Sequence, residues 1–272
     1  MEYAVRTGTS WGTPRTLPFR TITTPALAVH DGRLHIAYLR PEDQAVMWAG
    51  MDASGTWTAP TLIHADQSWY GPTLTSANGK LHYAVTGKDG PVYTRTYTPA
   101  GGWSGHHRMS GWKQYSPALA TYEGQAWLVG YGVDENLWHS RHNGTSWSGW
   151  QEDDLDWKLN THVALAPRDN RLWLIATGKG GQIHTSINGG GTWVGQGIPS
   201  DRRRSSHAPA LAGNGQTMTL LIRGTDATLW SAEFNGSWAA GAHKVPGITL
   251  KETPAAVYFG GNLHVMYRRT AT

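Results

Sequence analysis

Side chains that can exchange protons or donate hydrogen bonds recur at one place in a repeated pattern. They stand one or two residues before a short run of the type Pro-Ala-Leu-Ala: Tyr70, Tyr115, His162, His207 and Glu252. A histidine or a carboxylate can act as an acid or base, and a tyrosine hydroxyl can donate a hydrogen bond. The set therefore predicts either a binding site for a polar ligand or a catalytic site, with Tyr115, His162, His207 and Glu252 as the catalytic groups. A water-filled channel lined by ordinary polar residues is the third interpretation.

Arginine and tryptophan residues near these positions extend the candidate site. Arg223 and Arg268 end strand-like runs and could hold a carboxylate or a phosphate. Tryptophans in the preceding loops present flat apolar faces that suit the C–H faces of sugars, although packing between repeats would also use them. The ligand-binding residues predicted in this way are Trp69, Tyr70, Trp112, Tyr115, Trp157, His162, His207, Arg223, Glu252 and Arg268.

The sequence predicts neither a metal ion nor a cofactor. His106-His107 and the pair His139 and His142 lack accompanying carboxylates at ligand spacing. The sequence has no phosphate-binding loop and no dinucleotide-binding motif. It also has no cysteine, which excludes disulfides and thiolate chemistry.

These candidate residues belong to a repeat that runs through the whole chain. A tryptophan after a turn-forming segment recurs every 44 to 46 residues, at Trp11, Trp57, Trp103, Trp147, Trp193 and Trp238. The distance from the last of them through the C-terminus and round to the first is also about 45 residues. The chain therefore consists of six repeat units, one of which is divided between the two ends of the chain.

Each unit reads as four short antiparallel strands, and no segment shows sustained helical periodicity. This predicts an all-β fold, a single six-bladed β-propeller that covers residues 1–272 as one domain. The N-terminal run 2–5 aligns with third strands, whereas the last unit ends after its second strand, near Tyr267. We therefore expect the N-terminal strands to close the last blade, which removes exposed sheet edges.

Composition narrows the possible partners and location. The formal net charge of +4 is spread widely, so no nucleic-acid partner is predicted. No run approaches about 18 apolar residues, so no membrane span is predicted. No signal peptide is visible, which predicts a cytoplasmic protein, although secretion after removal of a leader stays open.

Several segments resemble those of two known families. The turn at 186–193, with Asn188 and three glycines, resembles the Asp-box of sialidase-type propellers, which implies a propeller and no catalytic role. The segments 132–140 and 143–150, and also 224–231, resemble repeats of the PLL-like bacterial β-propeller lectins. That resemblance implies sugar recognition in shallow, multiple sites.

The leading functional hypothesis is a carbohydrate-binding, lectin-like propeller with a carbohydrate or small polar ligand. The alternative is an intracellular enzyme in which one asymmetric central pocket performs acid–base chemistry with Tyr, His and Glu on a small polar or glycosidic substrate. The strong differences between the repeats favour this alternative. A protein-interaction platform is the third hypothesis, since one fold hosts many functions.

Overall fold

The computed structural model describes residues 1–65, 67–110, 115–155, 157–159, 162–189, 192–197, 204–239 and 241–270. The chain divides into two compact units, one of Arg20–Asp153 and one of Met1–Phe19 with Asp154–Thr272. Throughout these described ranges the regular elements are strands, and no helix is long and apolar enough to cross a membrane.

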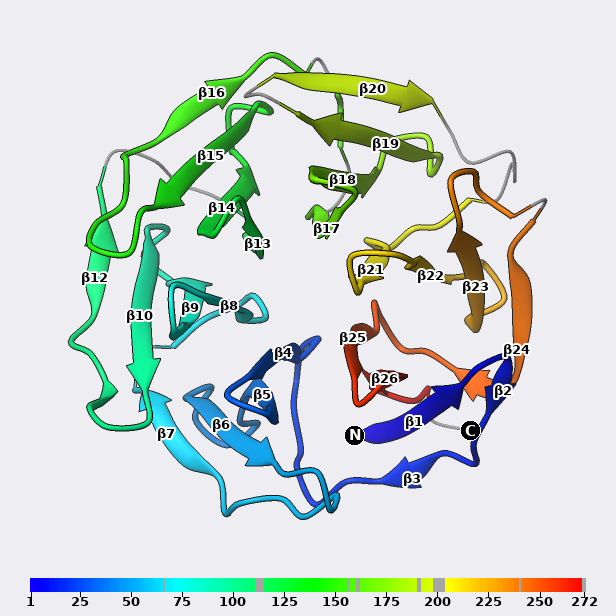
Figure 1. Cartoon of the computed structure of the whole chain (residues 1–272), viewed down its shortest axis with the longest axis horizontal. Helices are drawn as coiled ribbons and strands as arrows, with labels where there is room; N and C mark the ends of the chain where they lie inside the picture. Colours follow the sequence, from blue (N-terminus) through cyan, green and yellow to red (C-terminus); the bar gives the residue numbers. More distant parts are fainter. Residues whose placement is uncertain are drawn as a thin grey trace. The chain divides into compact units, whose positions relative to one another are not determined.

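The unit of residues 20–153 holds three antiparallel sheets, called blades 1 to 3 (Figure 1). Blade 1 consists of β4 (Ala26–His30), β5 (Arg33–Leu39), β6 (Val46–Met51) and β7 (Thr61–His64). Blade 2 consists of β8 (Thr73–Ala77), β9 (Lys80–Thr86), β10 (Val92–Thr98), β11 (Gly102–Trp103) and β12 (His107–Met109). Blade 3 consists of β13 (Ala118–Tyr122), β14 (Gln125–Tyr131), β15 (Leu137–His142) and β16 (Gln151–Asp153).

The other unit holds blades 4 to 6. Blade 4 consists of β17 (Ala164–Arg168), β18 (Arg171–Thr177), β19 (Ile183–Asn188) and β20 (Trp193–Gly197). Blade 5 consists of β21 (Ala210–Gly213), β22 (Met218–Arg223), β23 (Thr228–Phe234) and β24 (His243–Thr249). Blade 6 consists of β25 (Ala255–Phe259), β26 (Asn262–Tyr267), β1 (Glu2–Thr7), β2 (Ser10–Trp11) and β3 (Arg15–Thr16).

The N-terminal strands complete blade 6, as the repeat predicts. β1 runs antiparallel to β26, with Glu2 opposite Tyr267 and Arg6 opposite Leu263. Both β2 and β3 then pair with β1, so they form an interrupted fourth strand. Blade 2 has the same interruption, because β11 and β12 both pair with β10. The prediction of six antiparallel four-stranded blades, with the last closed by the N-terminal strands, is confirmed.

The repeated tryptophans occupy equivalent places. Each pairs with a residue at the end of the third strand of its blade, as in Trp11 with Arg6, Trp103 with Tyr97 and Trp193 with Asn188. Isolated bridges join the other three in the same way: Trp57 to Met51, Trp147 to His142 and Trp238 to Phe234. The spacing near 45 residues therefore reflects one structural position in every blade.

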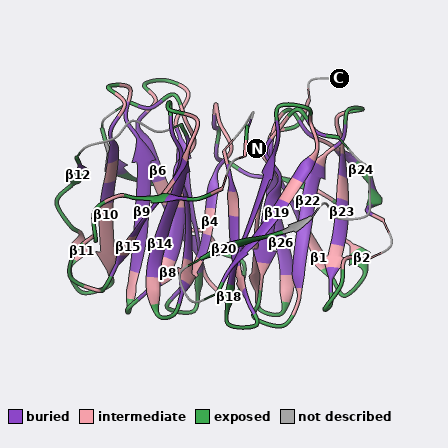
Figure 2. Ribbon diagram, turned by 90° about the horizontal axis from the view of Figure 1, so that it is seen from above, coloured by how far each residue is buried: buried purple, intermediate pink, exposed green. Residues whose placement is uncertain are grey.

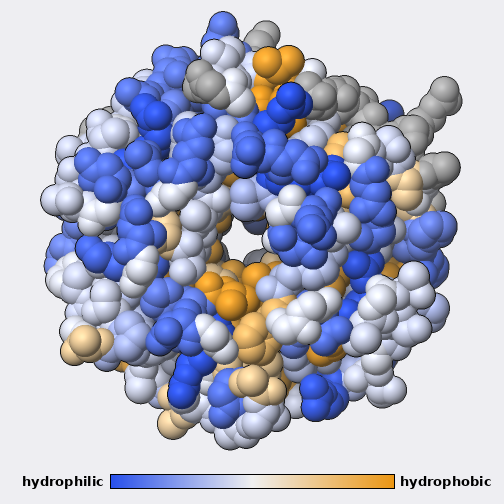
Figure 3. Space-filling model, viewed as in Figure 1, coloured by the Kyte–Doolittle hydropathy of each residue, from blue (hydrophilic) through white to orange (hydrophobic). Residues whose placement is uncertain are grey.

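The core lies between neighbouring blades of each unit. Figure 2 shows the strands mainly buried and the connecting turns exposed. Between blades 1 and 2, the small residues Ala26 and Ala28 of β4 pack in one cluster with Leu74 of β8 and with Leu81 and Tyr83 of β9. Alanine on the first strands allows adjacent blades to approach closely. On the face shown in Figure 3, hydrophilic residues predominate and hydrophobic ones gather in a few places.

Candidate functional site

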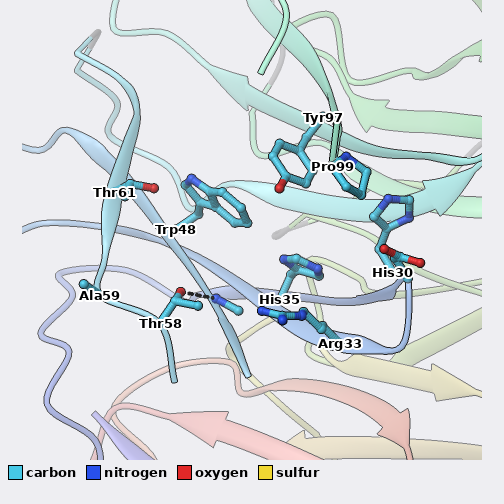
Figure 4. Close-up of a pocket in the computed structure, with 11 residues that line it drawn as sticks. His30, Arg33, His35, Trp48, Thr58, Ala59, Thr61, Tyr97 and Pro99 are labelled. Carbon is cyan, nitrogen blue, oxygen red and sulfur yellow. Dashed lines mark hydrogen bonds between the residues drawn. The ribbon is translucent and has the colours of Figure 1, made fainter. Parts of the chain in front are cut away.

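A pocket of about 430 Å³ lies between blades 1 and 2 (Figure 4). Its walls come from the β4–β5 hairpin, from β6 and the segment after it, and from β10. The lining residues are His30, Asp31, Arg33, His35, Trp48, Gly50, Thr58, Ala59, Thr61, Tyr97 and Pro99. All of them belong to the unit of residues 20–153.

The strand geometry explains why these side chains meet. A tight turn at Asp31 and Gly32, both with positive φ (48° and 68°), reverses the chain after His30. Gly50 of β6 lies opposite His35 of β5, and Trp48 lies two residues earlier on the same face. The Gly50 amide donates a hydrogen bond of 3.0 Å to Thr58 Oγ1, which fixes the following segment against the pocket (Figure 4).

Aromatic rings form one wall of the pocket. The His35 ring stacks on Trp48, with centroids 5.4 Å apart and planes inclined by 20°. The Tyr97 ring of blade 2 lies 4.7 Å from Trp48, and Trp103 meets Trp48 edge-on at 5.5 Å. The rings of His35, Trp48, Tyr97 and Trp103 therefore pack against one another in one continuous cluster.

The two histidines of the pocket are uncharged at neutral pH. Burial is the main cause that lowers the pKa of His35 to about 4, and the nearby charge of Arg33 adds to it. Burial also lowers the pKa of His30, against the opposing effect of Asp31. The pocket therefore combines neutral hydrogen-bonding rings with the exposed charged residues Asp31 and Arg33.

At one position of the pocket wall, blade 1 differs from the other blades. At the position of Gly50, the other repeats carry Val5, Thr96, Arg141, Ile187 and Glu233.

Aromatic or charged side chains also meet at the other interfaces between neighbouring blades of one unit. The rings of His82, His142 and Trp147 do so between blades 2 and 3. The rings of Trp173, Phe234 and Trp238 do so between blades 4 and 5. Between blades 5 and 6, Arg6 pairs with Glu233 and hydrogen-bonds Thr219 and Tyr258.

The residues predicted from the sequence lie elsewhere, and in the unit of residues 20–153 some of them come together. The rings of Tyr70 and Tyr115 meet edge-on at 6.2 Å, and Tyr115 stacks on Tyr131 at 6.3 Å. Trp69 is 63% exposed, and Lys88 Nζ lies 4.1 Å from its ring centroid. Trp112 lies outside the described residues, so its predicted role stays a prediction.

In the other unit, the predicted residues form two local groups. His162 is half-buried, and burial together with the charge of His207 lowers its pKa to about 4. Arg268 donates a 3.2 Å hydrogen bond to Glu252. Burial raises the pKa of Glu252, although the nearby Arg268 acts to lower it.

Two further predicted residues of this unit are engaged by neighbours. Arg223 Nε donates to the backbone carbonyl of Leu250 at 2.8 Å, so part of its guanidinium is already bound. Trp157 packs against His184, with centroids 5.3 Å apart.

None of the predicted site residues lines the pocket. Sequence reasoning missed His30, Arg33, His35, Trp48, Gly50 and Tyr97. One signal could have found the pocket: an alignment of third strands shows a glycine at position 50 where every other repeat has a side chain. The Gly-rich turn that resembles an Asp-box includes residues 190 and 191, which lie outside the described residues.

No known protein-family model matches the sequence, and no curated protein matches it significantly. Solved structures do match. The SapL1 lectin, in complex with α-methyl fucoside, aligns over 82% of this chain and 80% of its own, with a TM-score of 0.66 and 13% identity. A variant of the Aleuria aurantia lectin, bound to Fucα1-6GlcNAc, aligns over 91% and 88%, with a TM-score of 0.69 and 12% identity.

A bacterial lectin shows the same likeness. The BP39L lectin from Burkholderia pseudomallei aligns over 86% of this chain and 74% of its own, with a TM-score of 0.68 and 14% identity. At such identities the likeness concerns the fold. Together with the six antiparallel sheets and the closing N-terminal strands, it shows that the chain is a six-bladed β-propeller.

Proposed function

We propose that this protein is a carbohydrate-binding lectin and that the pocket between blades 1 and 2 is a sugar site. The observation that carries the proposal is the composition of the pocket walls. Neutral histidines and the charged Arg33 and Asp31 offer hydrogen bonds to hydroxyl groups, and the rings of Trp48 and Tyr97 offer apolar surface. A volume of about 430 Å³ falls in the range of small-molecule sites.

The structural neighbours support this class of ligand. The SapL1 lectin and the Aleuria aurantia lectin are described as complexes with fucose-containing sugars. Fucosides are therefore the first ligands to test. The finer resemblance to PLL-like lectins is part of the proposal and rests on the quoted segments of blades 3 and 5.

A single chain need not present many equal sites. The side chains at the interfaces between neighbouring blades differ from one interface to the next, as described above. The unit of residues 20–153 also has a smaller pocket of about 260 Å³ on blade 3, lined by Gln125, Arg141, Asn143, Ser146 and Ser148 and without aromatic residues in its walls. We expect the pocket between blades 1 and 2, which has aromatic walls, to be the sugar site of this unit.

The loop aromatics are the second candidate surface for the same sugar-binding function. Trp69 and Tyr115 are 63% and 41% exposed, and Tyr70 contacts Tyr115. Exposed rings of this kind suit sugar stacking. The acid–base alternative has weaker support, because the carboxylate of Glu252 is already hydrogen-bonded by Arg268.

A glycan array followed by calorimetry tests the proposal. Wild-type protein should bind at least one neutral glycan. Gly50→Thr should abolish this binding, because it introduces the side chain that blade 2 carries as Thr96. Gly50 has no positive φ, so threonine fits its backbone. Gly105→Thr is the matched control, since Gly105 faces open space and also lacks a positive φ.

Two outcomes would contradict the proposal. Absence of binding to every glycan would refute the lectin function. Full binding by Gly50→Thr would refute the pocket as the site and direct attention to Trp69, Tyr70 and Tyr115.

A further inference from the structure

We propose that Nδ1 of His35 is the specificity-determining acceptor of the pocket and takes a hydrogen bond from a hydroxyl group of a neutral sugar. This inference rests on the proposed sugar-binding function and names the chemistry that selects the ligand. It is carried by the hydrogen bonds of His35, by its counterpart in blade 6 and by the space in front of Gly50.

The hydrogen bonds fix which nitrogen of His35 carries the proton. Its ring bonds the backbone of His30, five residues earlier. His82 and His264 show the same arrangement, since Nε2 of each lies 3.2 Å and 3.1 Å from the carbonyl oxygen five residues earlier. A neutral imidazole has one N–H, and donation from Nε2 leaves Nδ1 as an acceptor.

That acceptor is buried and lacks a partner. His35 is only 4% exposed, and its Nδ1 has no hydrogen-bond partner within the described residues. A buried acceptor without a donor is costly, which favours a ligand that supplies one. The nitrogen belongs to a side chain that lines the pocket.

Blade 6 shows what the equivalent nitrogen binds. The Tyr3 hydroxyl donates to Nδ1 of His264 over 2.6 Å. Tyr3 lies opposite Met266, two residues beyond its histidine, and Trp48 lies opposite Ala37, two residues beyond His35. Trp48 therefore occupies the place of Tyr3 but has no hydroxyl to offer. A ligand hydroxyl would donate to His35 the hydrogen bond that the Tyr3 hydroxyl donates to His264.

Gly50 leaves space for a ligand atom beside this buried nitrogen. A Cβ atom at position 50 would lie 3.5 Å from Nδ1 of His35 and 3.4 Å from its Cε1. In blade 2, Nδ1 of His82 also lacks a partner among the described residues, but His82 is fully buried and the His142 ring lies 4.8 Å away. An unpartnered acceptor on a side chain that lines a pocket thus distinguishes blade 1 from blade 2.

An acceptor at this point selects for a donor. A sugar hydroxyl can donate, whereas a carboxylate can only accept and would face the nitrogen lone pair. A deoxy analogue that lacks the donating hydroxyl should bind less well, because it leaves the nitrogen buried and unpaired.

Nitrogen-15 NMR of the histidine side chains tests the inference with the full chain. The probes are the methyl glycosides of fucose, galactose, mannose and glucose, and methyl glucuronide. The tightest neutral glycoside should shift the Nδ1 signal of His35. The Nδ1 signal of His264, already bonded by Tyr3, is the internal control and should stay in place.

A matched pair of variants gives a second readout. Gly50→Ala should weaken the binding of that glycoside roughly 2- to 12-fold, the loss of one neutral hydrogen bond. Gly105→Ala should not change the affinity. If a glycoside binds while the His35 signal and the affinity of Gly50→Ala stay unchanged, this inference is refuted and the lectin function stands.

Two other outcomes also decide the question. Equal affinity for the tightest glycoside and for each of its deoxy analogues would overturn the inference. Binding of none of the five probes, with no shift of the His35 signal, would overturn the inference together with the proposed sugar-binding function.

Discussion

Replacement of Tyr3 by phenylalanine measures how much the hydrogen bond from Tyr3 to His264 contributes to stability. We use this bond in blade 6 as the model for a ligand hydroxyl at His35. The Tyr3 hydroxyl donates to Nδ1 of His264 over 2.6 Å, and the two residues are only 3% and 7% exposed. Tyr3→Phe keeps the ring and leaves a buried acceptor unpaired, which costs about 1–3 kcal/mol. With an unfolding entropy of about 2.1 cal/mol/K per residue over 272 residues, the melting temperature should fall by about 2–5 °C.

Calorimetric and denaturant-induced unfolding measure this change. Tyr97→Phe is the control, because within the described part of the chain the Tyr97 hydroxyl makes no hydrogen bond. Its free energy of unfolding should change by less than about 0.5 kcal/mol. Equal stability of Tyr3→Phe and wild type would refute the reasoning, since the hydroxyl would then contribute nothing at the histidine nitrogen. A ligand hydroxyl at His35 would then have no precedent in blade 6.

Three further predictions concern stability. Arg6→Met should destabilise the protein by about 1–3 kcal/mol in urea unfolding, because it breaks a partly buried ion pair with Glu233, the side chains being 10% and 33% exposed; an unchanged midpoint would contradict this. Trp69→Ala should change the free energy of unfolding by less than about 0.5 kcal/mol, since Trp69 is 63% exposed; a larger loss would show that its ring packs more than its exposure indicates. Stability should fall as the pH drops from about 6.5 to about 4, because burial lowers the pKa of His35 and of His82 to about 4. In this range the unfolded chain takes up protons that the folded chain does not, and each unit of pKa difference contributes about 1.4 kcal/mol to the free energy of unfolding. A flat profile of urea midpoints over this range would contradict the assignment.

The sequence alone determined the architecture, because the fold depends on a repeated local pattern. The six tryptophans mark one position in each blade, and each blade needs the same strands and turns to bury its faces against its neighbours. Because one repeat unit is divided between the two ends of the chain, the sequence also predicted that β1 pairs with β26. These conclusions need only period, alternation and turn residues.

The site depends on differences between repeats across a blade interface, and these differences required the tertiary structure. The sequence indicated polar residues before the first strands, and within each unit some of them do meet, as Tyr70 and Tyr115 do. It did not show that Tyr97 of blade 2 packs on Trp48 of blade 1, or that the position beside His35 is empty. Whether a buried position is filled or hollow depends on the summed volume of side chains from several strands. Only the packed structure reveals that sum.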